Sequence, residues 1–107
     1  TVPVEKIPLS VVIIAKNAAT QIGACIDSVM FADEVLVVDS GSQDETRAIA
    51  EVRGCRVIEK EWLGFGRQKQ FAVTQARHEW VLCLDVDERV TPALEAGIRA
   101  ALQVDPA

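Results

Sequence analysis

Short apolar runs alternate with stretches of helical spacing along the chain, and this alternation restricts the fold more than any other feature. The runs are typical of buried strands and occupy residues 9–15, 34–39, 56–59 and 80–84. After each run the pattern changes to amphipathic helix, over residues 20–31, 42–54, 67–77 and 91–102. Strand and helix therefore alternate four times, which predicts an α/β fold with a mostly parallel sheet.

Two rules of chain connection predict the strand order. Crossovers between parallel strands are right-handed, and consecutive strands usually become neighbours, which favours the order 3-2-1-4. Helices on both faces of this sheet would make a Rossmann-like three-layer sandwich. With 107 residues, the chain is expected to form a single domain, residues 1–107.

Local signals mark the ends of two helices. Ser42 and Glu45 have the spacing of a capping box with Ser42 as N-cap, and Gly54 is a suitable residue to end that helix. Thr91 followed by Pro92 indicates the start of the last helix. The second helix is expected to turn three residues inward: Ala48, Ile49 and Val52.

Composition and charge argue against several classes of function. A net charge of −5 and a pI of about 4.8 do not fit nonspecific nucleic-acid binding, which needs a basic face. No apolar run approaches the roughly 18–20 residues of a membrane span. The three cysteines lack a zinc-binding spacing and are expected to be free thiols, with Cys25 and Cys83 buried. The expected location is the cytoplasm, with the inner face of the membrane as the alternative for a full-length protein.

Polar residues directly follow three of the four expected strands. They are Lys16 and Asn17 after the first, Asp39 and Ser40 after the second, and Asp85, Asp87 and Glu88 after the fourth. Ligands of open α/β sheets bind beyond the carboxyl ends of the strands, where the strand order reverses. With the order 3-2-1-4, that crevice lies between the first and fourth strands, and Asp39 and the Asp85/Asp87 pair flank it.

These carboxylates each have two interpretations. Residues two apart on an extended backbone point to the same side, so Asp85 and Asp87 could hold one Mg²⁺ or Mn²⁺ that carries a diphosphate. The alternative is a solvated acidic turn that caps the next helix. Asp39 could accept hydrogen bonds from a ribose or a base edge, or it could cap the Ser-Gly turn that follows it.

Glycines and cations mark the segment before the third helix. Gly64 and Gly66 precede Arg67 and Lys69, which could close over phosphates at a helix start. The alternative is a surface loop with two solvated cations.

Three ring-bearing residues are also candidates. Trp62 and Phe65 either line a ligand or pin their loop to the core, and the core role is favoured. His78 is expected to be solvated or to cap an element rather than to act in catalysis.

Four motifs together resemble the family 2 glycosyltransferases of the GT-A fold. The motif at residues 62–69 resembles the bacterial lipopolysaccharide-core branch of that family. The resemblance extends from Leu9 to about Leu102. The motifs are Ser10-Val-Val-Ile-Ile-Ala-Lys-Asn17, Val37-Val-Asp-Ser-Gly-Ser-Gln-Asp-Glu-Thr46, Trp62-Leu-Gly-Phe-Gly-Arg-Gln-Lys69 and Leu84-Asp-Val-Asp-Glu88.

The resemblance implies a nucleotide-diphosphate-sugar donor, in most members a UDP-sugar, and a divalent metal, Mg²⁺ or Mn²⁺. Asp39 matches the acid that contacts the nucleoside, and Ser40 stands where many members carry a second acid. Asp85 and Asp87 match the DxD motif, with Asp87 as metal ligand and Asp85 near the metal, ribose or sugar. Lys69 would face the diphosphate. Transfer with inversion to a saccharide or lipid-linked saccharide acceptor, in envelope polysaccharide or lipopolysaccharide synthesis, is the implied reaction.

The chain departs from the family in length. Family members continue well beyond the DxD motif, with elements that bind the acceptor and supply a carboxylate general base, and no residue here matches that base. The chain is therefore interpreted as the nucleotide-binding half of a GT-A fold, a fragment that binds donor but transfers little sugar alone. An unpaired last strand would expose apolar surface, so self-association through this edge is also considered.

Two other functions stay open at this point. A non-catalytic nucleotide-binding or assembly module would share every feature above. A haloacid-dehalogenase-type phosphatase also places Asp-x-Asp after a strand, but it usually carries Thr or Val where this chain has Arg89.

Overall fold

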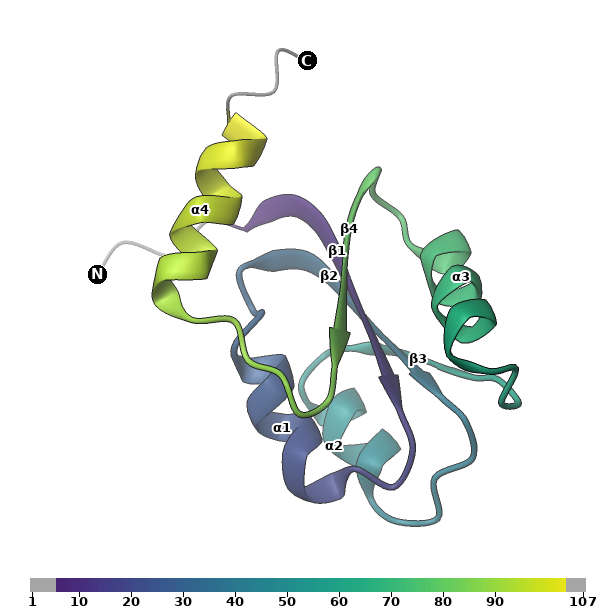
Figure 1. Ribbon diagram of the computed structural model, residues 1–107. Helices are drawn as coiled ribbons and strands as arrows, with labels where there is room; N and C mark the ends of the chain where they lie inside the picture. Colours follow the sequence, from purple (N-terminus) through teal and green to yellow (C-terminus); the bar gives the residue numbers. More distant parts are fainter. Residues whose placement is uncertain (1–5, 104–107) are drawn as a thin grey trace.

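The computed structural model describes residues 6–103. Within this range, four parallel strands form one sheet in the order β3-β2-β1-β4, as predicted (Figure 1). The strands are β1 (Ile7–Ala15), β2 (Ala32–Asp39), β3 (Arg56–Glu59) and β4 (Trp80–Asp85). The helices are α1 (Ala19–Asp27), α2 (Thr46–Val52), α3 (Phe65–Gln75) and α4 (Pro92–Gln103).

The sheet is covered on both faces, which confirms the three-layer arrangement. Alternate residues of a strand point to opposite faces, and β1 sends Val11 and Ile13 into one core and Val12 into the other. The larger core is completed by apolar residues of α1, α2 and α4, whereas the smaller one lies under α3 around Ala72. Figure 1 shows α3 alone on its side of the sheet.

The predicted capping box is wrong. Helix α2 begins at Thr46 rather than after Ser42, because the Ser42 hydroxyl bonds Asp39 and Asn17 instead of a helix N–H group. The carboxylate of Asp44 takes the N–H of Thr46 at 3.0 Å. Gly54 ends this segment with φ +83, as expected for a residue just past a helix.

The inward face of α2 also differs from the prediction. Its buried residues are Thr46 and Ala50, four positions apart, so Ala48 and Val52 fall on the outer side and Val52 is 85% exposed. Ile49 alone of the three is confirmed, since it is half-buried against the larger core. The N-cap role of Thr91 is confirmed, because its hydroxyl accepts the N–H of Leu94 at 3.1 Å.

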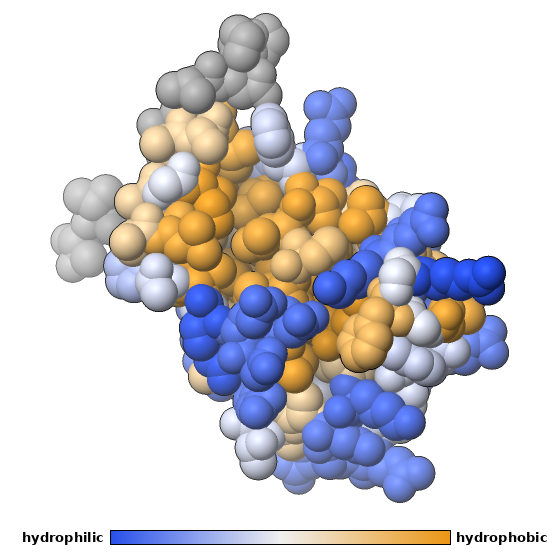
Figure 2. All heavy atoms as spheres, in the orientation of Figure 1, coloured by the Kyte–Doolittle hydropathy of each residue, from blue (hydrophilic) through white to orange (hydrophobic). Residues whose placement is uncertain are grey.

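The burial of the cysteines agrees only in part with the prediction. Cys25 is buried as predicted, but Cys83 is exposed, because β4 is the last strand of the described sheet and is incompletely covered. Figure 2 shows hydrophobic residues at the surface in the region of β4 and α4. No helix within residues 6–103 has the length and apolar character needed to cross a membrane.

Candidate ligand site at the carboxyl end of the sheet

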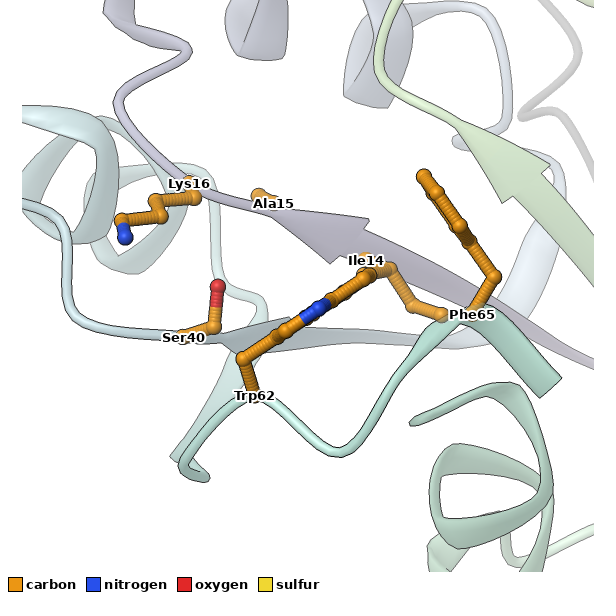
Figure 3. Close-up of a pocket in the computed structure, with 6 residues that line it drawn as sticks. All are labelled: Ile14, Ala15, Lys16, Ser40, Trp62 and Phe65. Carbon is orange, nitrogen blue, oxygen red and sulfur yellow. The ribbon is translucent and has the colours of Figure 1, made fainter. Parts of the chain in front are cut away.

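A pocket of about 310 Å³ opens beyond the carboxyl ends of β1 and β2 (Figure 3). Its walls come from the end of β1, the turn after β2, the linker after β3 and the first residue of α3. The lining residues are Ile14, Ala15, Lys16, Ser40, Trp62 and Phe65. The predicted edge of the sheet therefore does carry a cavity, with Ser40 in its wall. Its position differs from the prediction, because it lies over the ends of β1 and β2 rather than between β1 and β4, and its lining includes none of Asp39, Asp85 and Asp87.

Trp62 and Phe65 line this pocket rather than the core. Trp62 is 46% exposed and Phe65 is 71% exposed, and their rings meet edge to face with centroids 4.9 Å apart. The favoured expectation, that these rings pin the linker to the core, is wrong. A polar side chain anchors the linker instead.

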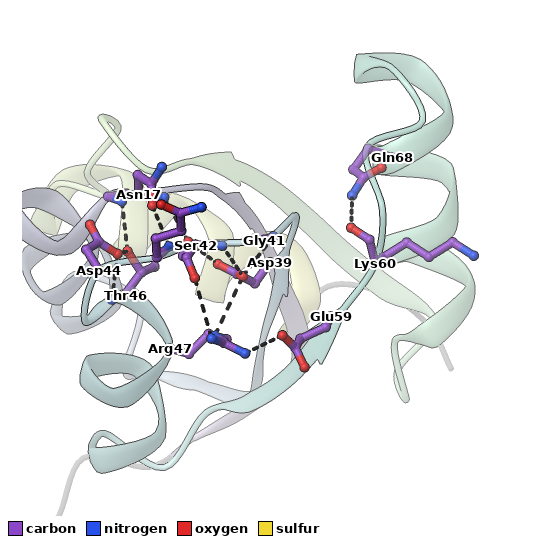
Figure 4. A network of polar contacts seen from close by, with 12 residues as sticks. Asn17, Asp39, Gly41, Ser42, Asp44, Thr46, Arg47, Glu59, Lys60 and Gln68 are labelled. Carbon is purple, nitrogen blue, oxygen red and sulfur yellow. Dashed lines mark hydrogen bonds and ion pairs between the residues drawn. The ribbon is translucent and has the colours of Figure 1, made fainter.

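That anchor is Gln68, which the sequence analysis missed. It is fully buried on α3, its Oε1 accepts the N–H of Leu63 at 2.9 Å, and its amide nitrogen donates to the carbonyl of Lys60 at 3.4 Å (Figure 4). Lys60 N–H in turn donates to the Asp39 carbonyl at 2.8 Å. The one available signal was the four-residue spacing between Gln68 and the buried Ala72.

Asp39 is fully buried at the end of β2, and its carboxylate organises the next turn. It accepts the N–H groups of Gly41 at 3.1 Å and Ser42 at 2.8 Å, together with the Ser42 hydroxyl (Figure 4). This is the turn-capping alternative. A contact between Asp39 and a nucleoside stays a prediction, whereas Ser40 beside it faces the pocket.

The turns after β1 and β2 are joined by side-chain hydrogen bonds. Asn17 donates its N–H to the Ser42 hydroxyl at 2.8 Å, and its Oδ1 accepts the N–H of Gln43 at 2.7 Å. The Thr46 hydroxyl accepts the N–H of Ala18 at 2.8 Å. These bonds fix the two turns that carry Lys16 and Ser40 relative to each other.

Asp85 and Asp87 do not sit on one extended strand. Strand β4 ends at Asp85, and a turn follows in which Glu88 N–H donates to the Asp85 carbonyl at 2.9 Å. The Glu88 carboxylate accepts the Asp85 N–H at 2.8 Å. Asp85 and Asp87 therefore do not point to one side of a strand, contrary to the prediction, although both side chains are exposed beside the turn.

Neighbouring residues hold this turn in place. Arg89 donates to the carbonyls of Val86 and Glu88, each at 2.7 Å, and the Cys25 thiol contacts the Asp85 carbonyl at 3.6 Å. Burial, the largest influence, raises the pKa of Cys25 to about 11, so its thiol stays protonated as a donor. The turn that carries Asp87 is thus held by contacts from Arg89 and from Cys25.

Lys69 of α3 reaches the end of β4. Its Nζ lies 4.0 Å from Asp85 Oδ1, and both side chains are about half exposed. Asp85 pairs in register with Ile14, a residue of the pocket wall, so this ion pair stands beside the pocket. Two of the predicted site residues are therefore brought together at its rim. His78 lies at the other end of β4, where it bonds Asp33 at 2.8 Å, and it is outside the site.

Among the described residues, no group of three or more His, Cys, Asp or Glu side chains is placed to hold a metal ion by itself. The exposed oxygens of Asp85 and Asp87 nevertheless suit a hard cation. Mg²⁺ commonly binds one or two carboxylates and completes its shell with waters and phosphate oxygens.

A parallel α/β sheet with a pocket and charged groups beyond its strand ends is the arrangement in which open α/β proteins bind ligands. Comparison with known proteins makes this specific. The chain belongs to glycosyl transferase family 2, whose model matches residues 10–106. The family membership argues against the phosphatase alternative.

Two relatives illustrate the similarity in sequence. An uncharacterized glycosyltransferase of Rickettsia bellii is 47% identical over 91 residues, which cover 84% of this chain and 31% of the relative. The lipopolysaccharide core biosynthesis glycosyltransferase LpsC of Rhizobium meliloti is 38% identical over 96 residues, 85% of this chain and 36% of LpsC. The chain thus spans about a third of the length of these relatives.

Solved structures support the GT-A fold. Glucosyl-3-phosphoglycerate synthase of Mycobacterium tuberculosis, in complex with phosphoglyceric acid, has a TM-score of 0.73 and 26% identity over 91% of this chain and 40% of the enzyme. The same enzyme with Mn²⁺, UDP and glucosyl-3-phosphoglycerate has a TM-score of 0.65 and 28% identity over 73% of this chain and 33% of the enzyme.

Proposed function

We propose that this chain is the donor-binding part of a metal-assisted glycosyltransferase that uses a UDP-sugar. The observation that carries the proposal is the Lys69–Asp85 pair at the rim of the strand-end pocket, 4.0 Å between charged atoms. A diphosphate needs positive charge, and the chain as a whole has a net charge of −5. Lys69 supplies that charge locally, beside the pocket.

The pocket and its rim would bind different parts of the donor. The nucleoside would lie in the pocket against Ser40, above the turn that Asp39 organises. The diphosphate would extend toward Lys69 and Asp85 at the end of β4. Complexes of the mycobacterial synthase with UDP support this choice of ligand, because that enzyme shares the fold.

Asp87 and Asp85 would hold the metal, Mg²⁺ or Mn²⁺. Their exposed carboxylates offer oxygen ligands, and the donor phosphates and waters would complete the shell. When bound, the metal supplies positive charge against the leaving diphosphate. The mycobacterial synthase with UDP has been solved with Mn²⁺ and with Mg²⁺, which supports the choice of a divalent cation.

The acceptor and the reaction are proposed with support from one relative. Similarity to LpsC, a lipopolysaccharide core biosynthesis glycosyltransferase, supports a role in lipopolysaccharide or envelope polysaccharide synthesis. We further propose a saccharide or lipid-linked saccharide acceptor, transfer with inversion and a location on the cytoplasmic side. We assign no residue of this chain as the general base that deprotonates the acceptor. The 107-residue chain should therefore bind donor and show little transfer.

Calorimetric titration of UDP, with and without Mn²⁺, tests this function. The wild-type chain should bind UDP in a metal-dependent manner, and Asp87→Ala should weaken binding at least tenfold because a metal ligand is lost. Asp33→Ala, an exposed aspartate at the opposite end of the sheet, is the matched control and should bind normally. A folded wild-type chain that binds no UDP in the presence of Mn²⁺ would contradict the proposal.

A further inference from the structure

We infer that Trp62, flanked by Phe65, is the stacking surface for the nucleobase of the donor, and that it therefore determines nucleoside affinity. The inference rests on the proposed function, since it names the part of the same donor that these rings contact. It gives the linker between β3 and α3 a specific binding role, because the sequence suggested phosphate contacts for its glycines and cations but no particular ligand group for its rings.

The exposure of the two rings is the first observation. Aromatic side chains are the largest apolar groups available to a core, and leaving two of them in water forfeits that burial. Trp62 and Phe65 nevertheless stand 46% and 71% exposed, side by side. Scattered apolar side chains on a surface are ordinary, but these two face the same cavity.

The linker does not need the rings for its own stability. Gln68, fully buried, binds the backbone of Leu63 and of Lys60, on either side of Trp62 in the chain. Gly64, with φ +97, allows the sharp entry into α3 that brings Phe65 beside Trp62. Anchoring and ring presentation are thus separate tasks of separate residues.

The shape and polarity of the pocket suit a planar base. Figure 3 shows the indole of Trp62 reaching toward Ile14, with Ser40 and Lys16 on one side and Phe65 on the other. The wall is apolar at Ile14 and the rings, and its polar groups lie at the Ser40 and Lys16 end. A nucleobase combines an apolar face with a polar edge, whereas a hexose or a phosphate would require polar groups around most of its surface.

The position of the rings relative to the charges agrees with this assignment. Ser40 follows β2, and the Lys69–Asp85 pair stands at the end of β4, across Ile14 of β1. A nucleotide with its base on Trp62 would therefore direct its diphosphate toward Lys69. The reverse orientation would place the phosphates at the Lys16 end of the pocket, away from Lys69 and from the exposed carboxylate of Asp85.

Tryptophan fluorescence tests the contact directly, because the two tryptophans lie toward opposite ends of the sheet. Trp80 begins β4 at the far end of the sheet from Trp62. In Trp80→Phe, the remaining indole of Trp62 should be quenched by uridine and by UDP with Mn²⁺. In Trp62→Phe, the remaining Trp80 should not respond to either ligand. A response of the same size from both variants would overturn the inference.

Calorimetry then measures the contribution of the ring. Trp62→Ala should weaken UDP binding roughly 5- to 100-fold, as expected for loss of one base–aromatic stack. Trp62→Phe should recover most of the affinity, and Trp80→Ala, which removes an equally exposed indole, should bind UDP as the wild type does. Binding of Mn²⁺-pyrophosphate, which has no base, should be the same in Trp62→Ala and wild type.

The outcomes separate this inference from the proposed function. If Trp62→Ala binds UDP normally while Asp87→Ala does not, the stacking role is overturned and the donor site stands. If the folded wild-type chain binds no UDP, both are overturned. If Trp62→Ala loses pyrophosphate as well as UDP, the ring supports the site as a whole rather than the base, and the inference is again overturned.

Discussion

The two ends of the parallel sheet both carry charged side chains, and they use them differently. At the amino end, Glu34 of β2 is buried and accepts the Ser10 hydroxyl at 2.7 Å, the Arg77 N–H at 2.8 Å and the Arg56 guanidinium at 2.9 Å. At the carboxyl end, Lys69 and Asp85 are 4.0 Å apart and half exposed. The first group is fully coordinated by protein, whereas the second has room for a ligand.

This difference separates stability from binding. No buried side-chain polar atom of residues 6–103 lacks a hydrogen-bond partner, so buried charge in this part of the chain is already satisfied. Asp39 belongs with Glu34 in this respect, although it lies at the carboxyl end of the sheet. Carboxylates that hold a fold and carboxylates that meet a ligand are distinguished by their partners, not by their position in a motif.

Removal of the Glu34 carboxylate should cause the largest loss of stability. Glu34→Ala leaves Arg56 and Arg77 without their shared partner and removes three hydrogen bonds, which should lower the free energy of unfolding by about 3 kcal/mol. Urea denaturation measures the change. The matched control, Glu51→Ala on the exposed side of α2, should stay within about 0.5 kcal/mol. A Glu34→Ala chain as stable as wild type would show that the amino-end cluster is not structural.

Loss of the linker anchor should be the next largest effect. Gln68→Met keeps the length of the side chain but leaves the Leu63 N–H and the Lys60 carbonyl unpaired, which should cost about 2 kcal/mol. Gln70→Met, the exposed glutamine two residues further along α3, should change stability little. Equal melting temperatures for the two variants would contradict the anchoring role.

Acid should destabilise the amino end through the same Glu34. Burial raises its pKa, but hydrogen bonds from Arg77 and Ser10 and the charges of Arg56 and Arg77 outweigh burial, so the pKa lies below the ordinary 4.5. A carboxyl with a depressed pKa in the folded state stabilises fully above about pH 4.5 and loses that contribution as the pH falls through its folded pKa. Protonation keeps the carboxyl group in place, so this loss should be smaller than that in Glu34→Ala.

The pH dependence is measured by denaturation between pH 3 and pH 7, a range of about four units that includes the ordinary pKa of a glutamate side chain. Wild type should lose more stability on acidification than Glu34→Gln, which cannot titrate at this position. Parallel curves for the two proteins would show that another carboxylate dominates acid sensitivity.

Sequence patterns predicted the order of strands and helices. The site was predicted less well, because side chains there form hydrogen bonds with residues distant in the sequence or with the turn itself. The strand order follows from apolar periodicity and crossover handedness, which are local and general. The hydrogen bonds of Ser42 could not be predicted in this way, because Asp39 and Asn17 approach its hydroxyl only in the folded chain. The same holds for Glu88, whose bond to the Asp85 N–H turns the chain at the point where an extended strand was expected.

The smallest effect on stability should come from the carboxyl-end ion pair. Its loss tests the difference between the two ends of the sheet most directly, because stability and binding should respond differently. Lys69→Met should change the free energy of unfolding by less than about 0.5 kcal/mol, because a half-exposed pair at 4.0 Å contributes little. The same change should weaken UDP binding about tenfold, since the lost ammonium would have met phosphate. Arg67→Met, an exposed cation on the same helix, is the control and should leave UDP affinity within about twofold. A Lys69→Met chain that unfolds readily yet binds UDP as tightly as wild type would reverse the assignment, making Lys69 part of the scaffold and leaving the phosphates to another cation.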